Sequence, residues 1–341
     1  DMCIIFLGGE NMLILAKSIL GLTLGFVLAL IVGILVIPVL KQLKAGQNVS
    51  RLINKRHLKK EGTPTIGGLI FIIPPLVAIL LLALKGSIVI TSNLSIVIFV
   101  FLAYGILGFL DDYLKIRYHN NKGLSILTKL IIQLFIAVVF YTVYKHNGGT
   151  TTLEVSLLGI KWELSWFYGV FILLLLVGTT NAVNITDGLD GLCGGLAAMA
   201  FLAYGIISWG SDWIVGYDGM AIFSFVLVGS LLGFLMFNTH PARVFMGDTG
   251  SLALGGALAT IAILTHHEIS LALIGGVFVI EVISSFIQII AIRKFNTKVF
   301  LKAPIHHHFE ELGWSEQDIV KCFWVAGFLL AMFGVVYGVW L

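Results

Sequence analysis

Long apolar segments recur along the whole chain and are separated by short polar connections. A helix that spans a lipid bilayer needs about 20 mostly apolar residues, and within lipid only helices and closed barrels satisfy their own backbone hydrogen bonds. Ten segments approach this length; Pro74 and Pro75 should kink the second, and the ninth is long enough to be tilted or bent. They lie near residues 12–40, 66–84, 94–113, 125–144, 166–183, 189–209, 218–237, 251–265, 269–292 and 319–340. The pattern predicts an all-α polytopic membrane protein with about ten transmembrane helices.

Residues 151–164, "TTLEVSLLGIKWEL", follow a different pattern, because apolar and polar residues alternate on both sides of Gly159. A period of two is typical of strands, and a glycine between two such runs is typical of a hairpin turn. We therefore expect a short β-hairpin between the fourth and fifth helices. The chain has no strong internal repeat, so residues 1–341 are expected to form a single membrane domain.

The Lys and Arg residues are distributed unevenly between the two predicted faces of the membrane. All but four of the 21 lie in or beside the connections that follow the odd-numbered helices, and the exceptions are Lys17, Lys85, Lys145 and Lys161. Cytoplasmic connections carry the excess of basic residues in membrane proteins. These connections are therefore expected to be cytoplasmic, and both termini and the hairpin are expected to lie outside.

Composition agrees with this class of protein and limits the partners. Hydrophobic residues make up 58% of the chain and charged residues 11%, and the mean hydropathy is +1.02. These values exclude an ordinary soluble domain. The net charge of +3 is small, so nothing indicates a nucleic acid partner. Membrane lipid is the partner that the composition implies.

Five polar motifs interrupt this apolar chain, and all five fall on the predicted cytoplasmic face. They are "HLKKEGTPTIGG" (57–68), "LDDYLK" (110–115), "NAVNITDGLDGL" (181–192), "FNTHPARVFMGDTGSL" (237–252) and "APIHHHFEELG" (303–313). A structural membrane protein does not need five polar segments on one side. Their convergence predicts an active site on the cytoplasmic face.

Acidic residues in two of these motifs indicate a divalent cation. Asp111 and Asp112 are adjacent at the end of a helix, where carboxylates often only mark the boundary with water, but adjacent carboxylates also repel each other. Mg²⁺ relieves such repulsion, since it prefers carboxylates, phosphate oxygens and water. Asp248 comes just before the eighth helix, where it would act as an N-cap or as a metal ligand beside a phosphate. Alongside the other motifs, the metal interpretation is favoured.

Polar residues spaced three apart stand out in "NAVNITDGLDGL". Asn181, Asn184 and Asp187 would share one face of a helix, and Gly188 and Gly191 would let backbone N–H groups approach a ligand. Asparagines and glycines also occur where transmembrane helices pack together. Ionisable aspartates at membrane depth are functional candidates by default, so a functional role is favoured here.

The remaining motifs supply basic groups and imidazoles. Lys60 precedes a glycine-rich turn, which suits an anionic substrate. Three consecutive histidines, His306 to His308, cannot converge on one zinc ion from a regular helix, so phosphate binding or proton handling is expected, with one or two of them structural. Glu281 in the ninth helix is expected to pair locally.

Together these motifs resemble the phospho-N-acetylmuramoyl-pentapeptide transferase family, within the polyprenyl-phosphate N-acetylhexosamine-1-phosphate transferase superfamily. The resemblance covers essentially the whole chain. It implies Mg²⁺-dependent transfer of phospho-MurNAc-pentapeptide from UDP-MurNAc-pentapeptide to undecaprenyl phosphate, giving lipid I and UMP at the bacterial cytoplasmic membrane. It also allows a homodimer. "GTPTIGG" and "PIHHHFEE" favour this branch over the GlcNAc-1-phosphate transferases, and an ion-coupled transporter is a remote alternative because the acids cluster at one interface.

The resemblance also assigns roles to individual residues. It implies that Asp248 is the Mg²⁺ ligand, that Asp112 activates the acceptor beside Asp111, and that Asp187 is the third essential acid. A single displacement is favoured. The residues expected to line the uridine and ribose pocket are Asn181, Asn184, Asp190, Asn238 and Phe245, with Phe245 stacking on uracil. The residues expected to bind phosphate or the nucleoside sugar are Lys60, Thr65, His306, His307 and His308, with His306 also counted as catalytic.

Overall fold

The computed structural model describes residues 2–43, 60, 62–118, 123–155, 159–210 and 217–339. Several basic residues used for the predicted orientation, at 44–59 and 122, lie outside these ranges, as do residues 57–59 and 61 of the first motif. The helices are α1 (Met2–Gln42), α3 (Leu69–Leu84), α4 (Ser92–Arg117), α5 (Ile126–His146), α6 (Trp166–Thr186), α7 (Leu192–Gly210), α8 (Tyr217–Asn238), α9 (Gly247–Leu264), α10 (Glu268–Ile274), α11 (Gly276–Phe295), α12 (Ile305–Glu311) and α13 (Glu316–Val339).

Nine helices in the described ranges are long and apolar enough to cross a membrane. They correspond to nine of the ten predicted spans, and the remaining one, α3, is an apolar helix of 16 residues that contains Pro74 and Pro75. Local capping fixes two of the starts, since Thr91 accepts a hydrogen bond from Leu94 N–H and Ser125 accepts one from Thr128 N–H. The mainly helical membrane fold predicted from the sequence is confirmed.

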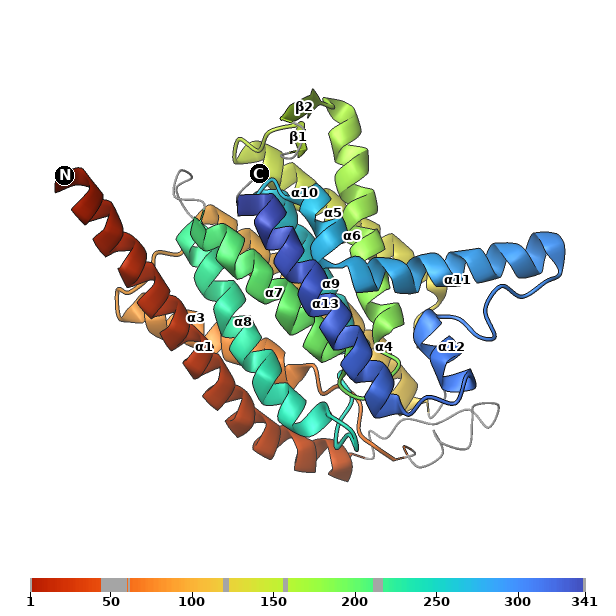
Figure 1. The fold of residues 1–341 in the computed structure, drawn as a ribbon. Helices are drawn as coiled ribbons and strands as arrows, with labels where there is room; N and C mark the ends of the chain where they lie inside the picture. Colours follow the sequence, from red (N-terminus) through yellow and green to blue (C-terminus); the bar gives the residue numbers. More distant parts are fainter. Residues whose placement is uncertain are drawn as a thin grey trace.

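The most buried part of the bundle lies around α8 and α9. Both helices are 89% buried over their most apolar window, whereas α1 and α5 are 22% buried. α8 packs against α1 and α7, and α9 packs against α4 and α6 (Figure 1). The outer helices leave their apolar side chains exposed, as expected for surfaces that contact lipid tails.

The predicted ninth helix is divided in two. α10 ends at Ile274, and after the single residue Gly275 α11 begins at Gly276 and extends away from the bundle (Figure 1). The chain then returns through the short helix α12, which carries the three histidines and which the apolar pattern did not predict. This return places α12 near the end of the bundle where α4 and α6 finish.

The predicted hairpin is present. β1 (Thr152–Val155) pairs antiparallel with β2 (Ile160–Glu163), with Thr152 opposite Glu163 and Val155 opposite Ile160. The turn contains Gly159 at a φ of +61°, in the left-handed region that favours glycine. In Figure 1 the hairpin lies toward the same end of the bundle as the C-terminal end of α13.

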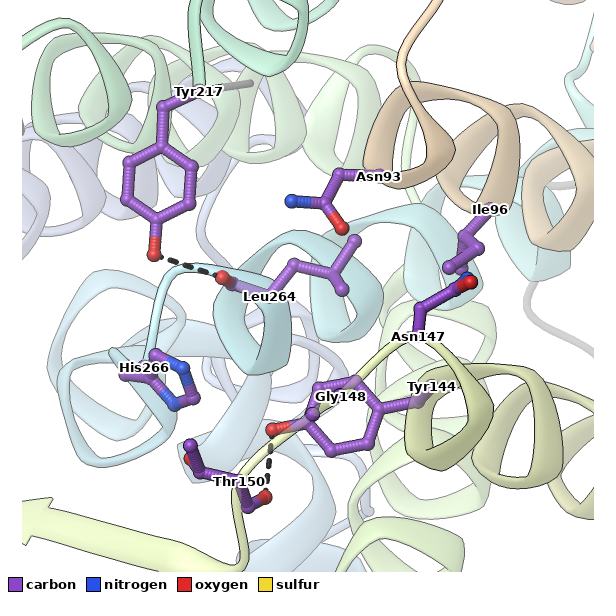
Figure 2. Close-up of a pocket in the computed structure, with 10 residues that line it drawn as sticks. Asn93, Ile96, Tyr144, Asn147, Gly148, Thr150, Tyr217, Leu264 and His266 are labelled. Carbon is purple, nitrogen blue, oxygen red and sulfur yellow. Dashed lines mark hydrogen bonds between the residues drawn. The ribbon is translucent and has the colours of Figure 1, made fainter. Parts of the chain in front are cut away.

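A polar region surrounds a cavity of about 180 Å³ near this end of the bundle (Figure 2). Asn93, Tyr144, Tyr217 and His266 are among the residues that line it. Tyr217 donates a hydrogen bond to the carbonyl of Leu264, and Tyr144 donates one to the carbonyl of Thr150. The first bond ties the start of α8 to the end of α9, and the second ties the end of α5 to the loop before β1.

Glu268, at the start of α10, predicts a pH-dependent stability. Its side chain is buried and receives a hydrogen bond from the Tyr168 hydroxyl. Burial raises the pKa of Glu268 from 4.5 to about 7. Because folding favours the neutral acid, its contribution to the free energy of unfolding is complete below about pH 4.5 and is lost as the pH rises through 7. The loss should be on the order of 3 kcal/mol.

Glu268→Gln, which stays neutral, should therefore unfold at a higher temperature than the parent protein at pH 8. The difference in melting temperature should shrink as the pH falls toward 5. Thermal unfolding in detergent across pH 5 to 9 measures this difference. A difference that does not change with pH would contradict the assigned ionisation of Glu268.

Candidate active site

Three acidic side chains meet where α4 ends and α9 begins. Asp111 and Asp112 belong to the last turns of α4, and Asp248 belongs to the first turn of α9. One carboxylate oxygen from each lies within 4.8 Å of the other two. The two helices approach closely because residue 108 is glycine: a Cβ there would lie 2.0 Å from the carbonyl oxygen of Asp248.

Asp112 holds the start of α9 in place. Its Oδ1 accepts a hydrogen bond from Asp248 N–H at 3.2 Å, and its Oδ2 accepts bonds from Thr249 N–H at 2.9 Å and the Thr249 hydroxyl at 2.7 Å. The first N–H groups of a helix have no partner within the helix. The buried carboxylate of Asp112 therefore caps α9 from another helix.

Two lysines lie among the three carboxylates. Lys115 Nζ is 2.6 Å from Asp111 Oδ2 and 3.1 Å from Asp248 Oδ2. Lys129 Nζ, from α5, is 2.6 Å from Asp248 Oδ2 and 3.4 Å from Asp111 Oδ2. We call these five residues the acid–lysine cluster. Asp111 and Asp112 are buried and the other three side chains are half-buried, so the opposite charges offset part of the cost of removing each from water.

Residues of α6 border this cluster. Asn184 Nδ2 donates to Asp248 Oδ1 at 2.9 Å and to Ser251 Oγ at 2.8 Å. One turn earlier, Asn181 Nδ2 donates to Gln133 Oε1 at 2.9 Å. The two asparagines therefore contact different partners, and only Asn184 contacts the cluster directly.

Asp187 follows the last residue of α6, and the charges of the acid–lysine cluster shift its pKa. Burial, together with the negative charges of Asp248 and Asp112, raises its pKa to about 8. A carboxyl group in this position is easily protonated unless a cation lies nearby. The site therefore has a surplus of negative charge around Asp187.

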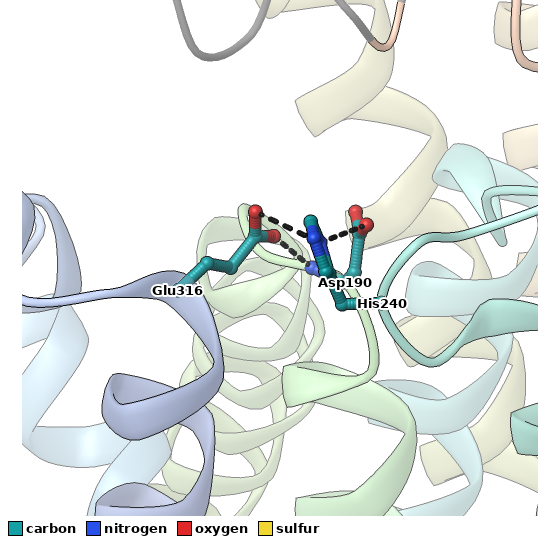
Figure 3. Close-up of side chains that lie close together, drawn as sticks. All are labelled: Asp190, His240 and Glu316. Atoms are coloured by element: carbon teal, nitrogen blue, oxygen red, sulfur yellow. Dashed lines mark hydrogen bonds and ion pairs between the residues drawn. The ribbon is translucent and has the colours of Figure 1, made fainter.

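A second group of charged residues lies beyond the turn that follows α6, and three of its members are drawn in Figure 3. Lys60 Nζ is 2.6 Å from Asp190 Oδ1 and 2.6 Å from Glu316 Oε1. His240 Nδ1 is 3.1 Å from Asp190 Oδ2, which also accepts a hydrogen bond from Ala242 N–H. We call Lys60, Asp190, His240 and Glu316 the Lys60 cluster. Burial opposes the charge on Lys60, but the carboxylates of Glu316 and Asp190 outweigh it and raise the pKa of Lys60.

Phe245 lies beside the Lys60 cluster, with Lys60 Nζ 5.9 Å from the centre of its ring. Backbone hydrogen bonds position it, since Phe245 N–H donates to the carbonyl of Pro64 at 2.9 Å and the Phe245 carbonyl accepts from Gly67 N–H at 2.8 Å. The motifs at 57–68 and 237–252 therefore pair directly. A half-buried aromatic ring beside an ammonium group suits a flat heteroaromatic ligand.

Asn238 and Thr65 link the neighbouring loops. Asn238 accepts a hydrogen bond from Gly191 N–H at 3.1 Å and donates to the carbonyl of Val244 at 2.9 Å. Thr65 Oγ1 lies close to Gly247, where an added Cβ would be 2.5 Å away. Asn238 is thus engaged with the backbone, and Thr65 lies next to the start of α9.

The three histidines of α12 have three separate partners. His306 Nδ1 is 3.0 Å from Glu281 Oε2, and both side chains are fully buried. His307 pairs with Glu310, and His308 Nδ1 accepts a hydrogen bond from Leu301 N–H at 3.1 Å. The expectation that Glu281 pairs locally is confirmed. His306 also faces the turn after α6, because a Cβ at Gly188 would lie 2.3 Å from His306 Nε2.

Comparisons with known proteins agree with this arrangement. Residues 94–266 match glycosyl transferase family 4. The phospho-N-acetylmuramoyl-pentapeptide-transferase of Bacillus subtilis (strain 168) is 48% identical over 318 residues, which cover 93% of this chain and 97% of the relative. The relative of the same name from Geobacillus sp. (strain WCH70) is 46% identical over 323 residues, covering 95% and 98%. The chain belongs to the phospho-N-acetylmuramoyl-pentapeptide-transferase family.

Membership in this transferase family raises the question of whether the acid–lysine cluster fits a divalent metal ion. Asp111 Oδ2 and Asp248 Oδ2 face the same two ammonium groups, so both oxygens point toward one position. The three carboxylates exceed the two lysines by one negative charge. Carboxylate oxygens are the ligands that Mg²⁺ prefers, and they fit it well. Both oxygens of Asp112 accept hydrogen bonds from the start of α9, whereas Oδ2 of Asp248 and Oδ2 of Asp111 contact lysine side chains that an ion could replace. Asp248 and Asp111 are therefore the better ligands.

Four residues of the candidate site were not singled out from the sequence. Lys115 and Lys129 were counted only as basic residues of the cytoplasmic face, although the spacing of Asp111 and Lys115 by four residues on one helix was a usable signal. Glu316 and His240 had no signal of their own, because each reaches the site only through the packing of α13 and of the loop after α8.

Proposed function

We propose that this chain transfers phospho-MurNAc-pentapeptide from UDP-MurNAc-pentapeptide to undecaprenyl phosphate, releasing UMP and forming lipid I for peptidoglycan biosynthesis. The observation that carries this proposal is the meeting of the acid–lysine cluster and the Lys60 cluster on the two sides of the turn after α6. One cluster suits the reacting phosphates and the other suits the nucleotide. Identity of nearly half the residues along almost the full length of named relatives supports the same substrates.

The reaction joins two anions, so charge neutralisation and positioning should supply most of the catalysis. A phosphate oxygen of undecaprenyl phosphate attacks the sugar-bound phosphorus of the nucleotide sugar, and the bond from that phosphorus to the bridging oxygen breaks as UMP leaves. A Mg²⁺ ion held by Asp248 and Asp111 would neutralise pyrophosphate charge. Lys115 and Lys129 lie where they can bind the phosphate oxygens. The acceptor phosphate is largely ionised near neutral pH, which favours a single displacement.

In our proposal, the chief role of Asp112 is to position Asp248 and Lys115. Three hydrogen bonds from the start of α9 occupy its two oxygens. Those bonds set the position of Asp248, and the negative charge of Asp112 holds Lys115 nearby at 3.7 Å. Asp187 lies beside the same position, where a bound cation would favour its charged form, and we assign it to metal and phosphate organisation.

The nucleotide is assigned to the other side of the turn. Phe245 would stack on uracil, while Lys60 and Asp190 offer a donor and an acceptor to the edge of the base. The remaining residues proposed to contact the nucleotide sugar or its phosphates are Thr65, Asn181, Asn184, Asn238, His306, His307 and His308. Of these, His306 lies closest to the glycine turn that separates the two clusters.

We also propose that the site lies on the cytoplasmic face and that α3 crosses the membrane with the nine longer helices. Ten crossings would place both chain ends outside, within a single membrane domain. The excess of basic residues on the connections after α1, α4, α8 and α11 supports this orientation. In Figure 1 the hairpin and both chain ends lie toward the end of the bundle opposite α12.

An assay for the lipid product tests the proposal. The purified protein is given undecaprenyl phosphate, Mg²⁺ and either UDP-MurNAc-pentapeptide or UDP-GlcNAc, and the lipid product is separated by thin-layer chromatography. We expect lipid I and one UMP per lipid with the first donor, and no product after chelation of Mg²⁺. A product with UDP-GlcNAc alone would support the neighbouring GlcNAc-1-phosphate branch, and no product with either donor would refute the transferase.

A further inference from the structure

Glu316 joins three segments of the Lys60 cluster through one carboxylate. Its Oε1 accepts hydrogen bonds from Lys60 Nζ at 2.6 Å and from Asp190 N–H at 2.7 Å. Its Oε2 lies 3.5 Å from His240 Nδ1. The side chain is only 14% exposed. Contacts of this kind, between ionised groups shielded from water, are among the stronger hydrogen bonds in proteins.

The helix that carries Glu316 is itself fixed to the turn after α6. Trp324, two turns further along α13, donates from Nε1 to the carbonyl of Gly191 at 3.3 Å. Its indole lies against Gly195, where an added Cβ would be 2.2 Å from Trp324 Nε1. α13 therefore contacts the turn at two points. Glu316 accepts a hydrogen bond from an amide N–H of the turn, and Trp324 donates one to a carbonyl.

The position of Lys60 depends on both carboxylates that contact it. Asp190 and Glu316 are each 2.6 Å from the ammonium group, so the loss of either charge leaves Lys60 held from one side only. Lys60 also lies near the face of Phe245. A shift of its ammonium group would therefore change the space and the donor offered to a base stacked on that ring.

We propose that Glu316 is a positioning residue of the nucleotide pocket. It fixes the ammonium group of Lys60 and the amide of Asp190 relative to each other, and it thereby sets the affinity for the uridine diphosphate part of the donor. It does not touch the reacting phosphorus. This inference rests on the proposed function, because it takes the Lys60 cluster to be the nucleotide pocket.

The first test compares Glu316→Gln with a matched control, Asp318→Asn. Asp318 is another carboxylate in the first turn of α13, but it is 62% exposed, and among the described residues its polar contacts are with Ser315 and Lys321 only. We expect Glu316→Gln to raise the dissociation constant for UDP, measured by calorimetry, and the KM for the nucleotide sugar by roughly tenfold. We expect kcat to change by less than about twofold. Asp318→Asn should match the parent protein in all three.

A double-mutant cycle with Lys60→Met shows whether Glu316 acts through Lys60. In the Lys60→Met background, Glu316→Gln should weaken UDP binding by less than about twofold more, because the group that it positions is gone. Two results would overturn the inference: an equal loss of UDP affinity in both backgrounds, or an unchanged UDP affinity in Glu316→Gln. Neither result would contradict the proposed transferase function. Failure of the parent protein to bind UDP would instead refute the nucleotide pocket itself. If Glu316→Gln cannot be purified, Glu316→Asp replaces it in both tests. Aspartate keeps the negative charge, but its side chain is one methylene group shorter, and the same outcomes support or overturn the inference.

Discussion

Asp248→Asn is expected to lower kcat for lipid I formation by at least about a thousandfold while the protein stays folded. The carboxylate of Asp248 faces Lys115, Lys129 and Asn184 and supplies one of the two oxygens best placed for Mg²⁺. An asparagine of the same size keeps the packing at the start of α9 but removes the charge. Both the metal and the lysines would then lose their common partner.

The assay measures the initial rate of lipid I formation in detergent, with thermal unfolding as the check on folding. Asp218→Asn is a matched control, because Asp218 is an exposed carboxylate in the first turn of α8, another membrane-spanning helix. The control should turn over at the parental rate. Turnover of Asp248→Asn within about tenfold of the parent would refute its role in holding the metal.

Asp112→Asn should damage both activity and stability, and this double effect distinguishes it from Asp248→Asn. Each oxygen of Asp112 accepts at least one hydrogen bond from the start of α9. Whichever way the new amide is turned, its NH₂ faces an N–H donor that loses its partner. Leaving a buried donor unpaired costs about 1–3 kcal/mol.

The melting temperature of Asp112→Asn should therefore fall by several degrees, and its rate of lipid I formation should fall by more than about a hundredfold as Asp248 shifts. Both quantities are measured on the same detergent preparation as the parent protein. An unchanged melting temperature would show that Asp112 does not cap α9. A large loss of rate without that change would move Asp112 from an organising role to direct contact with a substrate.

Most of the fold was predictable because lipid imposes a simple rule on sequence. A spanning helix must be apolar over most of its length, so the segments that became α4 to α9 could be identified directly. The break between α10 and α11 was not identifiable, because Gly275 and Gly276 stand within a segment that is apolar on both sides. The short helix α12 was missed because it is neither long nor apolar.

The acids of the acid–lysine cluster were predictable from the sequence, and its two lysines were not. Asp111, Asp112 and Asp248 stood out because carboxylates are rare in an apolar chain, and they do meet. Lys115 and Lys129 did not stand out, because lysines are expected on any cytoplasmic face. Asp190 comes three residues after Asp187 in the sequence, but the structure pairs it with Lys60. Such pairings depend on helix packing, which no local pattern records.

Under the proposed function, the separation into two clusters would give each part of the nucleotide sugar its own environment. The Lys60 cluster and Phe245 offer a flat pocket with a donor and an acceptor, while the acid–lysine cluster offers a metal position and two ammonium groups. The turn at 187–191 joins them. Within it, Gly188 lies against His306 and Gly191 donates to Asn238. Small residues here let both clusters approach one extended substrate.

The central claim is that Asp111 and Asp248 share one divalent ion, and binding of Mn²⁺ in place of Mg²⁺ tests it most directly. Free Mn²⁺ is followed by electron paramagnetic resonance as the ion is titrated into the parent protein, Asp248→Asn and Asp218→Asn. We predict one Mn²⁺ site per chain in the parent and in Asp218→Asn, displaced by Mg²⁺ and lost in Asp248→Asn. Equal Mn²⁺ binding by the parent and Asp248→Asn would contradict the account.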